Sequence, residues 1–255
     1  MSYEVIVVDN ASTDGSVEMV RERFPQARLT ENKRNIGFGA AHNMAIRSSD
    51  SRYVILLNPD CRLEDTDALT KVVKYLDENE DVGILGLRVL NPDGSLQFSA
   101  RRFPTISAAL FRHTIFGRMF PKNRFVRDYM MTDWDHSKPR NVDWVSGCAM
   151  VMRKEKVESV GLFDERFYMY CEDVDICKSA WAAGAKVRYF PFATVIHRIG
   201  AASDKDPYRM IYHFHLSMFR FYLKHICRSP GILLLPLVML GLTMRAIGFA
   251  LKVRK

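Results

Sequence analysis

The feature that most constrains the fold is an alternation of short apolar strands and amphipathic helices along the first half of the chain. Val5–Val8 and Tyr53–Leu57 are aliphatic and β-branched runs, which are typical of strands covered on both faces. Apolar residues recur at helical spacing after them, and we expect helices at Val17–Phe24, Gly39–Ser48 and Leu69–Leu76. The alternation predicts an α/β fold with a mostly parallel sheet flanked by helices.

The second half of the chain continues this alternation after turn residues at Asn91–Gly94. The elements expected there are a strand at Asp143–Met152, helices at Glu155–Val160 and Asp173–Ala183, and strands at Val187–Phe190 and Ala193–Ile196.

Positive charge is unevenly distributed along the chain. The formal net charge is +8, and residues 208–255 carry eight Lys and Arg but no acidic residue. Residues 1–207 are therefore neutral, although 101–140 hold nine basic and three acidic residues. A protein that binds nucleic acid usually spreads basic residues over its folded surface. We therefore expect no nucleic-acid partner.

The basic C-terminal segment is also apolar. Ser229–Met244 are sixteen uncharged residues, about 24 Å as a helix at ~1.5 Å per residue. This length is shorter than the ~30 Å hydrocarbon core, Pro236 interrupts the run, and Arg245 ends it. Residues 229–255 are expected to lie on an anionic membrane surface as a peripheral or monotopic segment, and a full span is the alternative.

The cysteines and the first residues indicate the compartment. Five cysteines without metal-finger spacing indicate reduced thiols in a cytosolic protein. Met1–Glu4 runs directly into a strand-like segment, so no cleavable signal peptide is expected. Together with the apolar tail, these features predict the cytoplasmic face of the inner membrane.

Carboxylates stand at the ends of predicted strands, where open α/β sheets bind ligands. Asp9 suits a hydrogen bond from a pyrimidine N–H group, and Asp60 suits a divalent cation that bridges two phosphates. Taken singly, each residue is better explained by local structure: Asp9 would cap the following turn, and Asp60 would close a tight turn. The small residues of Asn35–Asn43 would let backbone N–H groups approach an anion, although a plain loop into a helix has the same pattern.

A third candidate lies at Glu172–Asp175, where three carboxylates follow the aromatic segment Phe163–Tyr170. Capping of the helix dipole accounts for such a cluster. Apolar neighbours would also raise a carboxyl pKa toward the range of a general base. His197 follows a strand and suits a metal ion, although a lone histidine is more often structural.

Taken in order, these motifs resemble the family 2 glycosyltransferases over about residues 3–203. The motifs that carry the resemblance are Val7–Ser16, Asn35–Gly39, Leu57–Asp60, Trp144–Met150, Gly161–Phe167, Glu172–Asp175 and His197. Asn91–Gln97 with Arg101–Pro104 is similar to a bacterial, rhamnosyltransferase-like subset. The ordered set is far more specific than any single motif.

The resemblance implies a GT-A fold and inverting transfer from a nucleotide-sugar. It implies that Asp173 is the catalytic base beside Glu172, and that Asp60 and His197 bind Mg²⁺ or Mn²⁺. Asn58 stands where the family has the first carboxylate of Asp-x-Asp, which weakens that position as a metal ligand. The implied nucleotide-sugar-binding residues are Asp9, Asn10, Ser12, Asp14, Asn35, Gly37, Phe38, Asn43 and Asn58, and the acceptor-binding residues are Trp144 and Gly147.

The expected organisation is a GT-A domain at 1–207, with a nucleotide-sugar half at 1–100 and an acceptor half at 101–207, followed by a membrane-associating tail at 208–255. The expected reaction moves a sugar, rhamnose from a dTDP-sugar on the subset resemblance, to a hydroxyl of a cell-envelope glycan or a polyprenyl-diphosphate-linked acceptor. A nucleotidyltransferase and a catalytically silent membrane scaffold are the alternatives. Sugar transfer requires Asp9, Asp60 and Asp173 to converge on one cleft.

Family members normally begin with a strand and helix that precede the strand at Glu4–Val8, and this βα unit is missing from the sequence. We expect that about 30 further residues upstream would raise stability and activity.

Overall fold

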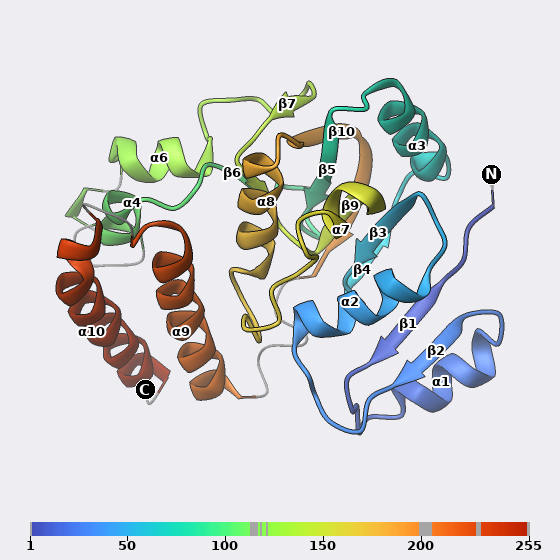
Figure 1. Ribbon diagram of the computed structural model, residues 1–255, viewed down its shortest axis with the longest axis horizontal. Coiled ribbons are helices and arrows are strands. Elements are labelled where there is room, and N and C mark those ends of the chain that lie inside the picture. Colours follow the sequence, from blue (N-terminus) through green and yellow to red (C-terminus); the bar gives the residue numbers. More distant parts are fainter. Residues whose placement is uncertain are drawn as a thin grey trace. The chain divides into compact units, whose positions relative to one another are not determined.

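The computed structural model describes residues 2–112, 117, 119, 120, 122–198, 206–227 and 231–253. The chain divides into two compact units. Unit 1 comprises residues 1–50, 162–175 and 200–255, and unit 2 comprises residues 51–161 and 176–199. Figure 1 shows the helices and strands of both units.

Unit 1 begins with a parallel crossover. β1 (Ile6–Asp9) pairs with β2 (Arg28–Glu31) through α1 (Ser16–Arg23), and α2 (Phe38–Ser48) packs against β1. Ile46, Ala40 and Ala41 form the buried face of α2. The predicted first strand and second helix are therefore confirmed. β2 was not predicted, because its sequence Arg-Leu-Thr-Glu contains a single apolar residue.

Two helices complete unit 1. α9 (Pro207–His225) packs against α10 (Leu235–Val253), which follows a 3₁₀ turn at Gly231–Leu234, and Figure 1 shows the two helices side by side. Asp206 caps α9 by accepting a hydrogen bond from Arg209 N–H at 3.1 Å. Pro236 is the second residue of α10, where proline is tolerated, so it does not interrupt the helix. Residues 229 and 230 of the predicted tail lie outside the described residues.

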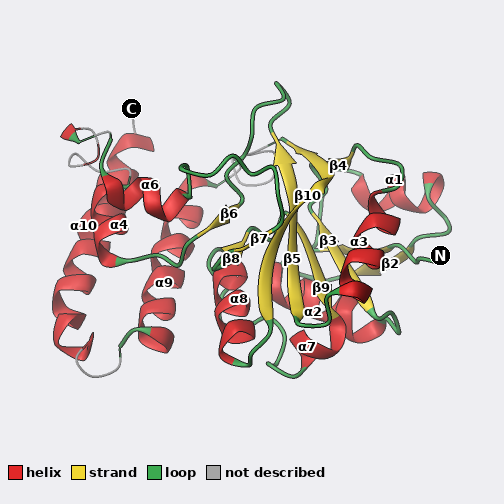
Figure 2. Ribbon diagram, turned by 90° about the horizontal axis from the view of Figure 1, so that it is seen from above, coloured by secondary structure: helices red, strands yellow, loops and turns green. Residues whose placement is uncertain are grey.

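Unit 2 is built on a six-stranded sheet, shown in yellow in Figure 2. The strand order is β3-β9-β5-β10-β4, and β7 pairs with β10. The bounds are β3 (Tyr53–Leu57), β4 (Cys61–Leu63), β5 (Val82–Leu90), β7 (Arg140–Asn141), β9 (Ala149–Arg153) and β10 (Lys186–His197). β5 and β10 are parallel, whereas β3–β9, β5–β9, β4–β10 and β7–β10 are antiparallel.

The α/β alternation is confirmed, but the expectation of a mostly parallel sheet needs correction in unit 2. β9 enters between β3 and β5 and runs antiparallel to both. The buried runs of β5 and β9 indicate that both faces of each strand are covered, and this burial carries no information about strand direction. The predicted strands at 187–190 and 193–196 are one strand, β10, with a register shift between Phe190 and Thr194.

The core of unit 2 lies between this sheet and α3 (Ala68–Glu78), with Leu76 and Leu85 fully buried. Burial of a Leu side chain contributes about 1.5–3 kcal/mol relative to exposure. A side chain at Gly86 would collide with Val145, so the sheet and β8 pack closely only with glycine there. The remaining elements are α7 (Lys154–Glu158), β6 (Ala100–Arg101), α4 (Ile106–Phe111), α6 (Arg124–Met130) and β8 (Trp144–Val145). α8 (Glu172–Ala182) begins in unit 1 and continues in unit 2.

Candidate active site

The loop after β1 forms an asparagine-rich cluster in unit 1. Asp9 is buried at the end of β1, and its Oδ2 accepts a hydrogen bond from Ser12 N–H at 3.0 Å. Asn10 Nδ2 donates to Gly37 O at 3.2 Å, and Asn32 Nδ2 donates to Asn10 Oδ1 at 3.0 Å. These bonds join the loop after β1 to the loop before α2. The structure therefore brings together two of the predicted nucleotide-binding segments.

The loop before α2 packs against the segment that leads into α8. Gly37 has φ +95°, and a Cβ there would lie 2.6 Å from Tyr168 O. Phe38 N–H donates to the same oxygen at 2.9 Å. A Cβ on Gly39 would lie 3.9 Å from the Cβ of Glu172. Glycine is required here because the two backbones approach so closely, and the approach places the Asn35–Asn43 loop beside the predicted catalytic residues.

The three carboxylates at the start of α8 have different environments. Asp175 is 1% exposed, and its two oxygens contact His225 Nε2 at 2.7 Å and Lys224 Nζ at 2.8 Å. Glu172 is also buried, and burial, followed by the charge of Asp173, raises its pKa well above the usual range. Asp173 is half-buried and is the most accessible of the three. Of these three carboxylates, Asp173 is therefore the one that is not buried.

The backbone before these carboxylates adopts an uncommon conformation. Tyr170 and Cys171 have φ of 66° and 64°, in the left-handed region that side chains other than glycine avoid. Ser217 Oγ donates to Met169 O at 2.8 Å, and Asp175 N–H donates to Cys171 O at 2.8 Å. Such residues cost roughly 1–3 kcal/mol each and often lie at functional sites. α9 therefore supports a strained turn that positions Asp173.

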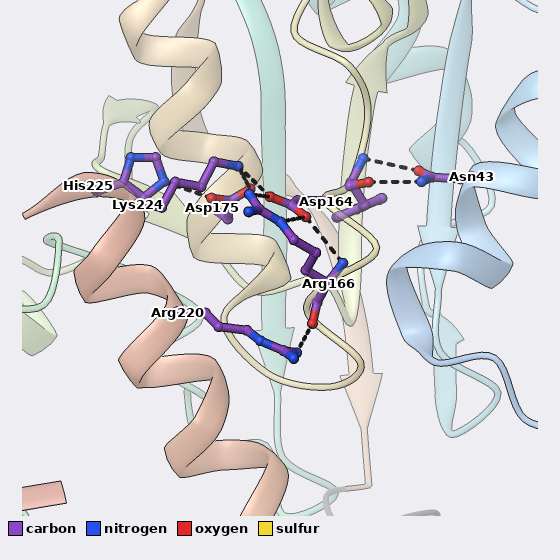
Figure 3. Close-up of polar contacts among 8 residues, drawn as sticks. Asn43, Asp164, Arg166, Asp175, Arg220, Lys224 and His225 are labelled. Carbon is purple, nitrogen blue, oxygen red and sulfur yellow. Dashed lines mark hydrogen bonds and ion pairs between the residues drawn. The ribbon is translucent and has the colours of Figure 1, made fainter. Parts of the chain in front are cut away.

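A network of ion pairs ties this turn to α9 (Figure 3). Lys224 Nζ lies 2.9 Å from Asp164 Oδ2 in addition to its contact with Asp175. Arg166 also pairs with Asp164, and these contacts lower the pKa of that carboxyl far below its usual range. Arg220 donates to Arg166 O. The helix that begins the predicted membrane tail is therefore part of the support of the candidate site.

The predicted metal ligands lie together in unit 2. His197 Nε2 is 3.3 Å from Asp60 Oδ1, and no described residue forms a well-directed hydrogen bond with that oxygen. Gln97 accepts at Oε1 from His197 Nδ1 at 3.0 Å and donates from Nε2 to His197 O at 2.7 Å. Because Nδ1 carries the proton in that bond, Nε2 is the nitrogen that can ligate a cation. A buried, unsatisfied carboxylate oxygen beside an oriented imidazole fits a divalent cation.

Two cysteine thiols lie close to His197. The ligand atoms of Cys61, Cys148 and His197 all lie within 4.8 Å of one another. A hydrogen bond from Cys61 lowers the pKa of the Cys148 thiol, and hydrogen bonding to Cys148 raises the pKa of His197. None of the five cysteines, all of which lie among the described residues, forms a disulfide bond. Asn58 N–H donates to Cys148 O at 3.0 Å, so the predicted metal loop is fixed to the segment that carries Cys148.

Several predicted residues have contacts that differ from the expected role. Asn43 is fully buried, and its amide pairs with the backbone of Phe163 at 2.9 and 3.0 Å and with Glu165 at 2.9 Å. Its side chain therefore stabilises the fold of unit 1 and offers no surface to a nucleotide. Asp14 Oδ1 accepts a hydrogen bond from Ser16 N–H at 3.3 Å in the exposed loop, and α1, whose N-cap is Gly15, has no side-chain cap among the described residues.

The predicted acceptor-binding residues, Trp144 and Gly147, are both buried in unit 2. Trp144 Nε1 donates to Arg102 O at 2.8 Å, and the Arg101 guanidinium lies 5.0 Å from the Trp144 ring. Asp9, Phe38 and Asp173 belong to unit 1, whereas Asp60 and His197 belong to unit 2. The convergence of Asp9, Asp60 and Asp173 on one cleft stays a prediction.

The sequence interpretation missed the residues that support these groups. Gln97 and Cys148 lie inside the motifs that carry the family resemblance, so their positions were visible but no role was assigned to them. Lys224 and His225 gave no local signal, because adjacent basic residues near a helix end are common and their partners lie about 50 residues earlier.

The chain has an α/β fold of the GT-A type, and comparison with known proteins gives its family. Residues 1–161 match the family model "Glycosyl transferase family 2". The N-acetylglucosaminyl-diphospho-decaprenol L-rhamnosyltransferase of Mycobacterium tuberculosis is 31% identical over 230 residues, which are 85% of this chain and 73% of the relative. The rhamnosyltransferase WbbL of Escherichia coli is 28% identical over 72% of this chain and 69% of its own length. The chain belongs to glycosyltransferase family 2 and is a glycosyltransferase.

Solved structures support the fold. A mannosyltransferase from Pyrobaculum calidifontis in complex with GDP-Man and Mn²⁺ has a TM-score of 0.55 at 18% identity, covering 98% of this chain and 69% of that chain. GalNAc-T7 with UDP, GalNAc and Mn²⁺ has a TM-score of 0.60 at 14% identity, covering 86% of this chain and 41% of that chain. At these identities the likeness concerns the GT-A fold alone, which confirms the predicted fold class.

Proposed function

We propose that this chain transfers L-rhamnose, with inversion, from a nucleotide-sugar to a polyprenyl-diphosphate-linked glycan. The sugar and acceptor class are those in the name of the Mycobacterium tuberculosis relative. The observation that carries the proposal is the environment of Asp173. It is the accessible carboxylate of three, at a strained turn that packs against the Gly37–Gly39 loop.

In the proposed reaction, Asp173 removes the proton from an acceptor hydroxyl, and the hydroxyl oxygen attacks the anomeric carbon as the nucleoside diphosphate leaves. Burial raises the pKa of Glu172 well above its usual range, and Asp173, the most accessible carboxylate of this turn, is the one that we assign as the base. Asp9, Asn10 and Gly37 belong to the donor-binding loops. Asp60 and His197 would bind Mg²⁺ or Mn²⁺, which neutralises charge on the leaving diphosphate when bound.

The test is a transfer assay with dTDP-L-rhamnose and a polyprenyl-diphosphate N-acetylglucosamine acceptor. Asp173→Asn is expected to lower kcat by about 10²–10⁴-fold, because the general base is lost. Asp50→Asn, which alters an exposed carboxylate of unit 1, is the matched control and is expected to leave kcat unchanged. Wild-type kcat in Asp173→Asn would refute the assignment. Release of pyrophosphate in place of nucleoside diphosphate would instead indicate a nucleotidyltransferase.

Metal use is tested on the same preparation. Chelation is expected to abolish transfer, and Mg²⁺ or Mn²⁺ is expected to restore it. Asp60→Asn and His197→Ala should raise the metal concentration required for half-maximal rate. Full activity after chelation, or an unchanged metal requirement in both variants, would exclude this site as the one that binds the cation.

The C-terminal helix would bring the enzyme to its lipid-linked acceptor. The 3₁₀ turn and α10 together form 23 helical residues, 231–253, which are long enough to cross a membrane; an 18-residue stretch of them has a mean hydropathy of 2.0 and contains no buried residue. Arg245 lies near its middle and packs 5.4 Å from the rings of Phe214 and Phe249. A central arginine in a span costs about 2.5–3.5 kcal/mol, so we favour a helix that lies in the cytoplasmic interface.

The interfacial position has its own test. Ten large apolar side chains are exposed on this helix: Ile232, Leu233, Leu234, Leu237, Met239, Leu240, Met244, Ile247, Leu251 and Val253. The protein is expected to float with vesicles that contain phosphatidylglycerol and to dissociate partly at high salt, because basic residues contribute about 1 kcal/mol each near an anionic surface. Extraction that succeeds only with detergent would favour a full span.

A further inference from the structure

The Cys61 and Cys148 thiols, to which the proposed transfer reaction gives no role, lie beside His197, one of the two proposed ligands of Mg²⁺ or Mn²⁺. The ligand atoms of these three residues all lie within 4.8 Å of one another, and Asp60 Oδ1 lies 3.3 Å from His197 Nε2. Two sulfurs, one imidazole nitrogen and one carboxylate oxygen are four ligands of the types that Zn²⁺ accepts. Hard cations such as Mg²⁺ prefer oxygen and gain little from thiolates.

The backbone fixes these ligands before any cation binds. His197 is paired with Cys61 in the antiparallel register of β10 and β4, so their side chains are cross-strand neighbours. Cys61 Sγ donates to Cys148 O at 3.2 Å, and Asn58 N–H donates to the same oxygen at 3.0 Å. Three segments that are distant in sequence are thereby joined through main-chain hydrogen bonds. A cation would order few additional atoms.

The distances among the Cys61, Cys148 and His197 ligand atoms allow these three residues to bind one tetrahedral ion after small side-chain movements. With Zn–S bonds of about 2.3 Å, two sulfur ligands lie about 3.8 Å apart. The two sulfur atoms are at most 4.8 Å apart in this structure, so they would need to approach each other by at most about 1 Å. Gln97 already orients the His197 ring through Nδ1, as residues behind metal-bound histidines commonly do.

We propose that Cys61, Cys148 and His197, with Asp60 as the fourth ligand, form a site for the thiophilic cation Zn²⁺. Occupation of this site withdraws His197 and Asp60 from Mg²⁺ or Mn²⁺. Zn²⁺ is therefore an inhibitor of the transfer reaction. This inhibition rests on the proposed function, whereas Zn²⁺ binding does not.

Zn²⁺ binding is tested on the full chain in the absence of sugar donor and acceptor, with the thiols kept reduced by a phosphine. Co²⁺ is expected to give a near-ultraviolet sulfur-to-cobalt charge-transfer band that Zn²⁺ abolishes. Cys61→Ser and Cys148→Ser should each weaken the band and lower Zn²⁺ affinity, measured by chelator competition, by at least about 100-fold. Gln97→Ala should lower affinity by about 10–100-fold. Cys227→Ser alters a cysteine of unit 1 that is not in a disulfide bond and serves as the control. It should leave the charge-transfer band and the Zn²⁺ affinity unchanged.

The outcomes separate this site from the transfer reaction. Absence of the charge-transfer band in wild type, or equal Zn²⁺ affinity in wild type and folded Cys61→Ser, would overturn the proposal whatever the enzyme transfers. Circular dichroism identifies any variant that fails to fold, and Gln97→Ala then supplies the test, because it keeps both thiols. In the transfer assay with Mn²⁺, micromolar Zn²⁺ should inhibit wild type and Cys227→Ser but not Cys61→Ser. Equal inhibition of all three would refute the competition.

Discussion

Replacement of Lys224 by Met tests the ion-pair network that joins α9 to the α8 turn. Lys224 Nζ lies 2.8 Å from Asp175 and 2.9 Å from Asp164, and the side chain of Asp175 is 1% exposed. Methionine preserves the length of the side chain but leaves the buried Asp175 carboxylate with His225, at 2.7 Å, as its ion-pair partner among the described residues. Removal of one partner of a buried pair costs about 3–5 kcal/mol.

The expected loss in this protein is smaller than that limit. The Lys224 side chain is 30% exposed and His225 remains, so we expect destabilisation of about 2–3 kcal/mol. For a chain of this size, about 2–4 °C per kcal/mol gives a fall in melting temperature of about 4–12 °C. Thermal unfolding followed by circular dichroism measures the shift. The kcat should fall as well, because Asp175 supports the turn that carries Asp173.

Two further variants make the reasoning refutable. Lys71→Met removes an exposed pair with Asp67 on α3 and should leave the melting temperature unchanged. Asp175→Asn combined with Lys224→Met should be more stable than Lys224→Met alone, because no buried charge is left uncompensated. The network does not stabilise the turn if Lys224→Met has the same melting temperature as Lys71→Met. The same conclusion follows if the double variant is no more stable than Lys224→Met.

Three other predictions follow from described contacts. Glu172→Gln should stabilise the protein above pH 5. Burial raises the pKa of the native Glu172 carboxyl, so the unfolded chain releases its proton at a lower pH, and the wild-type free energy of unfolding falls by up to about 1.4 kcal/mol per pH unit until the raised pKa is passed. Urea titrations at pH 5 and 8 should therefore show a smaller change in unfolding free energy for the variant than for wild type. Gly37→Ala should raise the donor KM and lower stability through collision with Tyr168 O, whereas Gly15→Ala, with positive φ but open space, should change stability alone. Leu240→Glu should reduce vesicle flotation, since this exposed side chain lies on α10, and unchanged flotation would place the membrane surface elsewhere.

Local elements were readable from the sequence because their signals are local. Tyr53–Leu57 was predicted with the bounds that β3 has, and the helix predicted at 173–183 is α8 at 172–182. Sheet direction was not readable, because β9 reaches its place between β3 and β5 only in the folded chain. Two strands were predicted at 187–190 and 193–196, yet β10 continues from one to the other with an irregular register.

The candidate site was predictable in its residue types and less so in its roles. Asp60 and His197 lie together as the resemblance implied, and the α8 carboxylates divide into one accessible and two buried side chains. Asn43 shows the limit: the same amide that suits a nucleotide pairs with the backbone of Phe163, 120 residues later. A motif specifies which groups are present, whereas burial decides which of them a ligand can reach.

The two faces of α9 have a practical consequence for shortening the chain. Ser217, Arg220 and Lys224 contact the 162–175 segment, whereas α10 packs on the same helix and carries the exposed apolar residues. A truncated protein that stops before residue 207 would lose the α9 contacts that support the turn before Asp173, together with the apolar helix α10. A truncated protein that stops after Cys227 would keep the contacts of α9 with residues 162–175. It is the better starting point for crystallisation of a water-soluble catalytic core.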